Sequence, residues 1–185
     1  MNKDVISGWR SLFFRHNINK IRKTILDYLA NEVIDTQVKD GVIRITLDDF
    51  HYTIDFDLSE EYPRCDISFQ IDDEEYKSLE LSQKTFIADK INTDEDRHST
   101  VKAFNASIVV DTHFYFANKR MLLSLFCDYF VDLKETLDET IDLAVSEIQE
   151  AEQKQRPIGF AASMAAKEKN KNLQQPAACG KNDMK

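Results

Sequence analysis

Glycine, proline and cysteine are all scarce in this chain of 185 residues, with four, three and three copies respectively. So little glycine leaves few positions for the glycine-rich loops that cradle phosphate groups. No GxGxxG, P-loop, HExxH or GxSxG pattern occurs in the sequence. The chain therefore has no recognisable catalytic motif, and we expect neither enzyme activity nor a cofactor.

The three cysteines, Cys65, Cys127 and Cys179, form no CxxC pair and have no metal-ligand spacing. An odd number of thiols without a secretory signal favours reduced cysteines. The first residues lack the continuous apolar segment of a signal peptide, and no apolar run reaches the roughly 18 residues of a membrane span. We therefore expect a cytoplasmic protein.

Positive charge is also in short supply, because 24 Lys and Arg stand against 33 Asp and Glu, which gives a net charge of −9. Phosphate backbones require a basic surface, so this balance argues against a nucleic-acid partner. The charge is unevenly spread, with net +5 over residues 1–24, −12 over 32–100 and +4 over 151–185. The basic ends are either solvated segments or contacts to an acidic surface, of a partner or of the body itself.

Hydrophobic periodicity predicts a helix first and strands after it. Ile and Leu recur at steps of three and four over residues 18–34, which Asn17 or Asn19 can cap. Polar and apolar side chains then alternate over residues 42–71, with turn residues between the runs. This alternation is typical of three antiparallel strands with one face in water.

The second half of the chain repeats this order. A helix is predicted over residues 81–94 with Ser82 as its cap, followed by a hairpin that turns at 105–107. A long amphipathic helix opens at Asn118 and contains neither Gly nor Pro up to residue 153. It is longer than a small sheet is wide, so part of its apolar stripe is a candidate homodimer surface. The residues of that candidate surface are Leu133, Leu137, Ile141 and Ile148.

These elements predict an α+β fold with a five-stranded, mainly antiparallel sheet. The order is helix, three strands, helix, two strands and long helix, with the helices on one face. A single domain is expected over residues 17–150, after an aromatic and basic extension over 1–16. Residues 151–185 are basic and of low complexity, which is typical of a disordered tail.

Four stretches resemble the type III secretion chaperone-like fold, and in particular the YbjN-like family, over about residues 17–148. They are "ILDYLANEVIDTQVKDGVIRITLDDFHYTIDFD", "LSEEYPRCDISFQID", "FIADKINTDEDRHSTVKAF" and "IVVDTHFYFANKRMLLSLFCDYFVDLKETLDETI". The resemblance implies a small acidic protein, often dimeric, that binds another protein. Secretion chaperones of this fold hold an extended segment of their partner. The resemblance brings no catalytic residues.

Asp111 and His113 are the most suggestive polar pair, since they lie two residues apart in the last strand. Strand alternation places them on the wet face, with Thr112 and Phe114 on the core face. We therefore interpret them as solvated side chains. The alternative is a metal or acid–base site that His98 or His51 completes, because one strand supplies only two of the three or four ligands a metal needs.

The N-terminal segment combines aromatic with basic residues, and Trp9, Phe13 and Phe14 are candidate partner-binding residues. Packing of this segment on the sheet is the interpretation we favour, and a partner contact or a membrane-surface role of residues 8–23 are the alternatives.

We favour a non-catalytic protein-binding module of secretion-chaperone-like or YbjN-like type. It would bind an apolar or extended segment of a protein partner, in a groove beside the first helix or by strand addition. The alternative functions are a metal-dependent enzyme or sensor that uses His113, Asp111 and His98, and a membrane-surface adaptor. A homodimer is expected as a further partner. No nucleic-acid partner, membrane partner or bound metal is expected.

Overall fold

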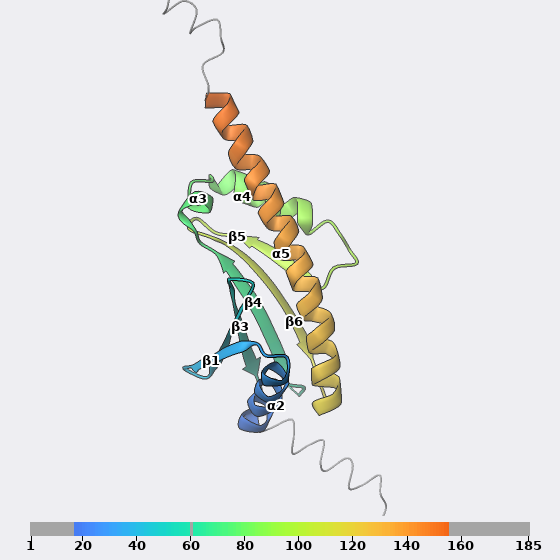
Figure 1. The fold of residues 1–185 in the computed structure, drawn as a ribbon. Coiled ribbons are helices and arrows are strands. Elements are labelled where there is room, and N and C mark those ends of the chain that lie inside the picture. Colours follow the sequence, from blue (N-terminus) through green and yellow to red (C-terminus); the bar gives the residue numbers. More distant parts are fainter. Residues whose placement is uncertain (1–16, 60, 156–185) are drawn as a thin grey trace, which may run out of the picture. The chain divides into compact units, whose positions relative to one another are not determined.

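The computed structural model describes residues 17–59 and 61–155 (Figure 1). The chain divides into two compact units after Ile148, and α5 continues past that boundary to Gln155. In chain order the elements are α2 (Ile18–Asn31), β1 (Asp35–Lys39), β2 (Val42–Leu47), β3 (Phe50–Asp57), β4 (Arg64–Ile71), α3 (Glu74–Lys77), α4 (Leu81–Ile91), β5 (Ser99–Ala103), β6 (Ile108–Tyr115) and α5 (Lys119–Gln155).

The six strands form one sheet in the order β1-β2-β3-β4-β6-β5, and every neighbouring pair is antiparallel. The expected α+β fold with an antiparallel sheet is confirmed. The expected number of five strands is wrong, because β1 adds a strand before the first one predicted, and four strands therefore precede α4. β1 was missed because it has only five residues, four of them exposed, so no apolar alternation marks it.

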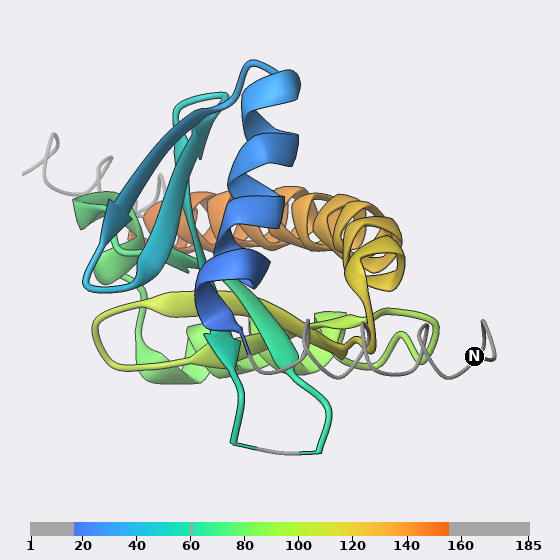
Figure 2. The same ribbon diagram turned by 90° about the horizontal axis from the view of Figure 1, so that it is seen from below.

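One face of the sheet is apolar and carries the core together with α2, α4 and α5. Figure 2 shows the sheet bending between the β1–β2 hairpin and the β5–β6 pair, with α2 and α5 inside the bend. Each fully buried aliphatic side chain contributes roughly 1.5–3 kcal/mol to this core. The side chains of the core that are completely inaccessible to water include Ile25, Ile43, Ile54, Ile67, Val110, Phe116, Leu122 and Leu133.

Two-residue turns join the first three strands. Asp40 and Gly41 have φ angles of 53° and 83°, and Asp48 and Asp49 have φ angles of 53° and 67°. Positive φ at both central residues defines the type I′ turn, whose twist matches that of the flanking strands. These turns fix the register of β1, β2 and β3.

α2 begins where the sequence predicts, since the amide of Lys20 donates to Asn17 Oδ1 at 3.0 Å. It ends at Asn31 rather than at residue 34. In α4 the predicted cap is wrong. Ser82 lies inside the helix, and Glu80 and Gln83 form a capping box in front of it.

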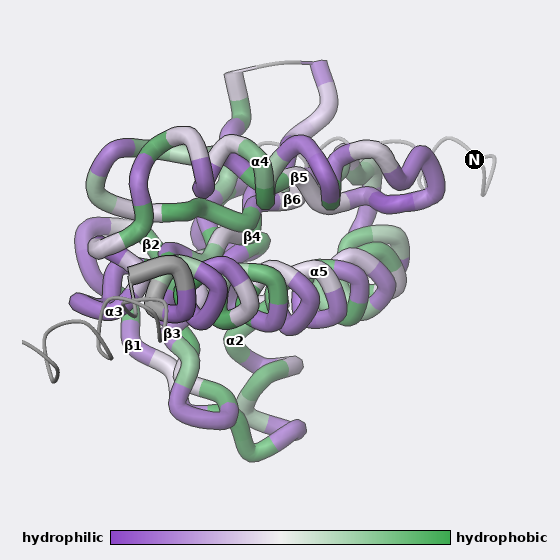
Figure 3. The backbone as a smooth tube through the Cα atoms, turned by 90° about the horizontal axis from the view of Figure 1, so that it is seen from above, coloured by the Kyte–Doolittle hydropathy of each residue, from purple (hydrophilic) through white to green (hydrophobic). Residues whose placement is uncertain are grey.

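α4 also turns a different face to the core than the periodicity predicts. Ile87 and Ile91 are buried as expected, but Phe86 is 54% exposed and Lys84 is fully buried. α4 lies beside β5, as Figure 3 shows. The sequence predicts a core face of Phe86, Ile87, Lys90 and Ile91. Lys90 is exposed instead, and Lys84 is buried, although a lysine is rarely buried without a partner.

α5 opens at Asn118 as predicted, because the amide of Met121 donates to Asn118 Oδ1 at 3.0 Å. Hydrophilic and hydrophobic residues alternate in bands along this helix (Figure 3). Its apolar stripe packs on the sheet. Along the described residues, no helix combines the length and the apolar character needed to cross a bilayer.

Candidate functional site at the sheet edges

Asp111 and His113 lie on the polar face of β6, as strand alternation predicts. Thr112 and Phe114 are buried on the opposite face. Asp111 is held by neighbours on β5, because Lys102 Nζ lies 2.6 Å from Asp111 Oδ2 and Thr100 Oγ1 lies 3.1 Å from Oδ1. An ion pair across two strands on a wet face is a stabilising surface feature of modest strength.

The other two candidate histidines have separate surroundings. His51 lies on β3 and shares a 3.0 Å hydrogen bond with Thr46 of β2. His98 lies directly before β5, not at the end of α4, and its ring stacks on Tyr129 of α5 with centroids 4.5 Å apart. Over residues 17–59 and 61–155, no three His, Cys, Asp or Glu side chains are grouped as a metal ion requires. The metal-site hypothesis therefore gains no geometric support.

The outer edge of β5 is closed by side chains from the helices. The Asn92 amide, one residue past α4, donates from Nδ2 to the Val101 carbonyl and accepts from the Val101 amide, both at 2.8 Å. A side-chain amide thus makes the two hydrogen bonds that a neighbouring strand would make. The backbone of β5 is satisfied at its centre.

Two further side chains hold the ends of β5. The Asp132 carboxylate of α5 accepts from the amides of His98 and Ser99, at 3.3 and 2.8 Å. The buried Lys84 ammonium donates to the Asn105 carbonyl in the β5–β6 turn at 2.8 Å. These bonds involve charged groups, which are the stronger class of hydrogen bond. An additional strand would meet side chains at the start and the centre of β5 and beside the turn that follows it.

β1 forms the other edge of the sheet, and half of its backbone points outward. The two-residue turn makes Lys39 and Val42 the hydrogen-bonded pair nearest the turn. Alternation then directs the backbone groups of Gln37 and Asp35 to β2 as well. The amide and carbonyl groups of Thr36 and Val38 consequently face away from the sheet.

Among the described residues, no side chain caps these outward groups. In the part of the chain that the structure describes, neither Thr36 nor Val38 has a backbone hydrogen bond on the outer side of β1. The Val38 side chain is 53% exposed. β1 is therefore an unpaired edge that carries an exposed apolar side chain, which is the feature that strand addition uses.

The residue that leads from α2 into β1 is conformationally unusual. Val33 has a φ angle of 60° and is 91% exposed. It occupies the left-handed position of a Schellman motif, in which the Ile34 amide donates to Leu29 O at 3.0 Å and the Val33 amide to Ala30 O at 3.2 Å. Glycine usually fills this position, because a β-branched side chain is strained there. An apolar, strained and almost fully exposed residue thus stands beside the open edge.

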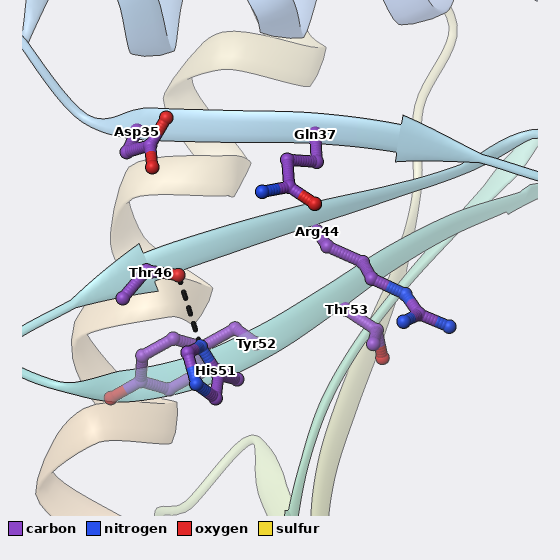
Figure 4. A pocket seen from close by; sticks show the side chains of 7 residues that line it. All are labelled: Asp35, Gln37, Arg44, Thr46, His51, Tyr52 and Thr53. Carbon is purple, nitrogen blue, oxygen red and sulfur yellow. Dashed lines mark hydrogen bonds between the residues drawn. The ribbon is translucent and has the colours of Figure 1, made fainter.

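A shallow pocket of about 310 Å³ lies on the polar face next to β1 (Figure 4). Side chains from three consecutive strands line it, and they carry both signs of charge. An added strand at β1 would place alternate side chains near this hollow. The lining residues are Asp35, Gln37, Arg44, Thr46, His51, Tyr52 and Thr53.

The described thiols are packed rather than reactive in their surroundings. Cys65 is fully buried in β4, and burial raises the pKa of its thiol well above the usual range. Cys127 Sγ lies 3.0 Å from the Tyr28 hydroxyl, and this hydrogen bond is the main cause that raises the pKa of Tyr28 to about 12. A buried thiol with a raised pKa is a weak nucleophile at neutral pH.

The residues proposed for contacts with partners fall in three places. Trp9, Phe13 and Phe14 lie outside the described residues. Leu133 and Leu137 are fully buried against the sheet, so their side chains belong to the core and offer no surface to a second chain. Ile141 and Ile148 are partly buried against the same core. Packing within the chain thus takes up the first two of the four residues of the candidate dimer surface.

Comparison with known proteins adds little. No protein-family model matches the chain, and no curated protein sequence matches it. Among solved structures, a chain described as an uncharacterized protein from Methanothermobacter thermautotrophicus has a TM-score of 0.47 and 15% identity. The match covers 71% of this chain and 98% of that one. The YbjN-like and secretion-chaperone resemblance stays a prediction without support from these comparisons.

Proposed function

We propose that this chain is a non-catalytic protein-binding module that binds an extended segment of a partner by strand addition at β1. The observation that carries the proposal is the contrast between the two sheet edges. The amides and carbonyls of Thr36 and Val38 point outward without partners among the described residues, whereas Asn92 closes the edge at β5. An unpaired edge of this kind supplies backbone hydrogen bonds to an added strand.

Two features beside β1 support binding rather than an accidental gap. Proteins usually protect an open edge with charges or proline on its outward positions, or by covering it. β1 carries the charges of Asp35 and Lys39, but Val38 is exposed near its turn end and Val33 is exposed just before the strand. The pocket lined by Asp35 and Arg44 lies on the neighbouring face and would accept polar side chains of the added strand. Backbone pairing would give affinity, and these side-chain contacts would give selectivity.

The proposal includes a cellular setting, which is the one that the sequence analysis predicts. A cytoplasmic module of secretion-chaperone-like or YbjN-like type would hold an extended region of a partner before that partner folds or is exported. Such a role needs a docking edge and no reacting group. It fits a chain that lacks catalytic motifs.

The experiment is a Val38→Pro substitution. The Val38 amide points away from β2, so proline there removes no hydrogen bond of the native sheet but blocks the edge. We expect partners that co-purify with the full chain from its native cell to be lost with Val38→Pro. Bound partner should also slow hydrogen exchange at the Thr36 and Val38 amides of the unsubstituted protein.

The matched control is Val38→Thr, which keeps the amide and the β-branched shape. We expect this variant to retain the partner. Unchanged thermal unfolding of Val38→Pro would establish that the sheet is intact. A partner that both variants retain equally would contradict strand addition at β1.

A further inference from the structure

We infer that the segment that fits β1 is β1 of a second copy of this chain, paired antiparallel about a twofold axis at Gln37. The inference rests on the proposed function to the extent that both use the same open edge. It names the partner and the register. Two sheets of six strands would join into one continuous sheet of both copies.

The backbone geometry of β1 suits this register. Placing Gln37 opposite its own copy sets Thr36 opposite Val38 of the second copy, and Val38 opposite Thr36. These two residues carry the outward amides and carbonyls, so both crossings become hydrogen-bonded pairs. The pairing of Gln37 with its copy falls at the intervening position without backbone bonds. A shift of the register by one residue would bring outward groups opposite inward ones.

The charges of β1 are complementary to themselves in this register. Asp35 comes to lie directly opposite Lys39 of the second copy, and Lys39 opposite Asp35. All four charged side chains project on the polar face, with the two Gln37 amides between them. Opposite charges at directly facing positions stabilise a strand pair. A parallel pairing in register would instead set like charges side by side.

The contact on the other face is apolar but small. The half-exposed Val38 meets Thr36 of the second copy there, and the same contact recurs across the axis. Five residues from each chain make a short interface, well below the area of a permanent dimer. We therefore infer a dimer that dissociates on dilution, in which a longer extended segment can replace the second copy.

The first test is a charge swap, read by analytical ultracentrifugation over a range of concentrations. Asp35→Lys alone and Lys39→Asp alone each turn two attractive pairs into two repulsive ones, so we expect each dimer to weaken roughly ten-fold. A mixture of these two variants restores opposite charges at both crossings. We expect the mixed dimer to recover the affinity of the unsubstituted chain.

The second test fixes the register through Gln37→Cys. Facing residues at a position without backbone bonds have Cα atoms about 4.5 Å apart, which lies within disulfide range. We expect mild oxidation to link the two copies through residue 37, identified by mass spectrometry of the joined peptide. Thr36→Cys is the matched control. Its copies lie two residues out of register, about 8 Å apart by strand geometry, and should not link.

The outcomes distinguish failure of this inference alone from failure of the proposed function. Cross-linking at residue 37 together with recovery in the mixture supports the β1 dimer. A protein that stays monomeric at all concentrations, or a dimer that Val38→Pro leaves unchanged, overturns it. Loss of a different co-purified partner with Val38→Pro would then still support strand addition at β1. If neither a second copy nor another partner binds β1, both proposals fail.

Discussion

The two edges of one sheet are treated differently by the rest of the chain. β5 is flanked by α4 and receives side chains from three positions, Asn92, Asp132 and Lys84. β1 receives none among the described residues, although α2 leads directly into it. Sheet edges are a general hazard, because their unpaired backbone recruits other strands. Side chains of this fold thus close one edge of the sheet, whereas no described residue closes the other.

The largest loss of stability is expected from a substitution that opens the closed edge at β5. Asn92→Ala leaves the amide and carbonyl of the buried Val101 without their partners. We expect the free energy of unfolding to fall by about 1–3 kcal/mol, measured by urea denaturation. Asn92→Asp keeps the acceptor and loses the donor, so its loss should be intermediate. An unchanged stability in Asn92→Ala would mean that water replaces the amide and that the edge is not truly closed.

A second test of the closed edge removes the carboxylate at its start. Asp132→Ala takes away the acceptor for the Ser99 amide, and we expect a loss of about 1–2 kcal/mol on urea denaturation. Asp128→Ala is the control, because Asp128 is an exposed residue of the same helix. Both variants gain the same helix propensity from alanine. Equal stability of the two would show that Asp132 does nothing for β5.

Replacing valine by glycine should have opposite effects on stability at two positions near the open edge. Val33→Gly removes the strain of a β-branched residue in the left-handed conformation. We expect the free energy of unfolding, measured by thermal unfolding, to rise by about 1 kcal/mol. Val38→Gly weakens an extended strand position and should cost roughly 0.5–1 kcal/mol. If Val33→Gly destabilises instead, the exposed valine makes a contact that offsets its strain.

The smallest effect on stability is expected in the core of the sheet, which lies between the two edges and is common to both. Burial raises the pKa of Tyr52, in β3, to about 12. The neutral phenol is favoured in the folded state, so this contribution is complete below about pH 10 and is lost as pH rises towards 12. Tyr52→Phe cannot ionise, and we expect its unfolding free energy to fall less steeply over that interval. Equal slopes would place Tyr52 in contact with water.

The sequence predicts those features that depend on near neighbours. Strand alternation places Asp111 and His113 on the wet face, and Asn17 and Asn118 cap their helices as expected. The sequence does not predict features that depend on contacts between residues far apart in the chain. Lys84 is buried with a partner, because its ammonium donates a hydrogen bond to a carbonyl in a turn 21 residues away.

Hydrophobic periodicity gives almost no indication of the candidate site. β1 has too few apolar residues for alternation to reveal it, and only the Asp40–Gly41 turn marks it. The closure at the centre of β5 depends on Asn92, which periodicity places within the helix predicted over residues 81–94. Which edge stays open is a property of tertiary packing, so it follows from the structure and not from the pattern.

The Asn92 closure also has a consequence for the order of events during folding. Asn92 and Val101 are nine residues apart in sequence, so their encounter is an intramolecular search over a short loop. Loops of this length close in roughly 10–100 ns, far faster than two proteins meet in solution. Sealing of the β5 edge by Asn92 is therefore a step within the chain, and its rate does not depend on protein concentration. Pairing at β1 requires a collision with another molecule. The fraction of β1 that is paired therefore depends on the concentration of the partner.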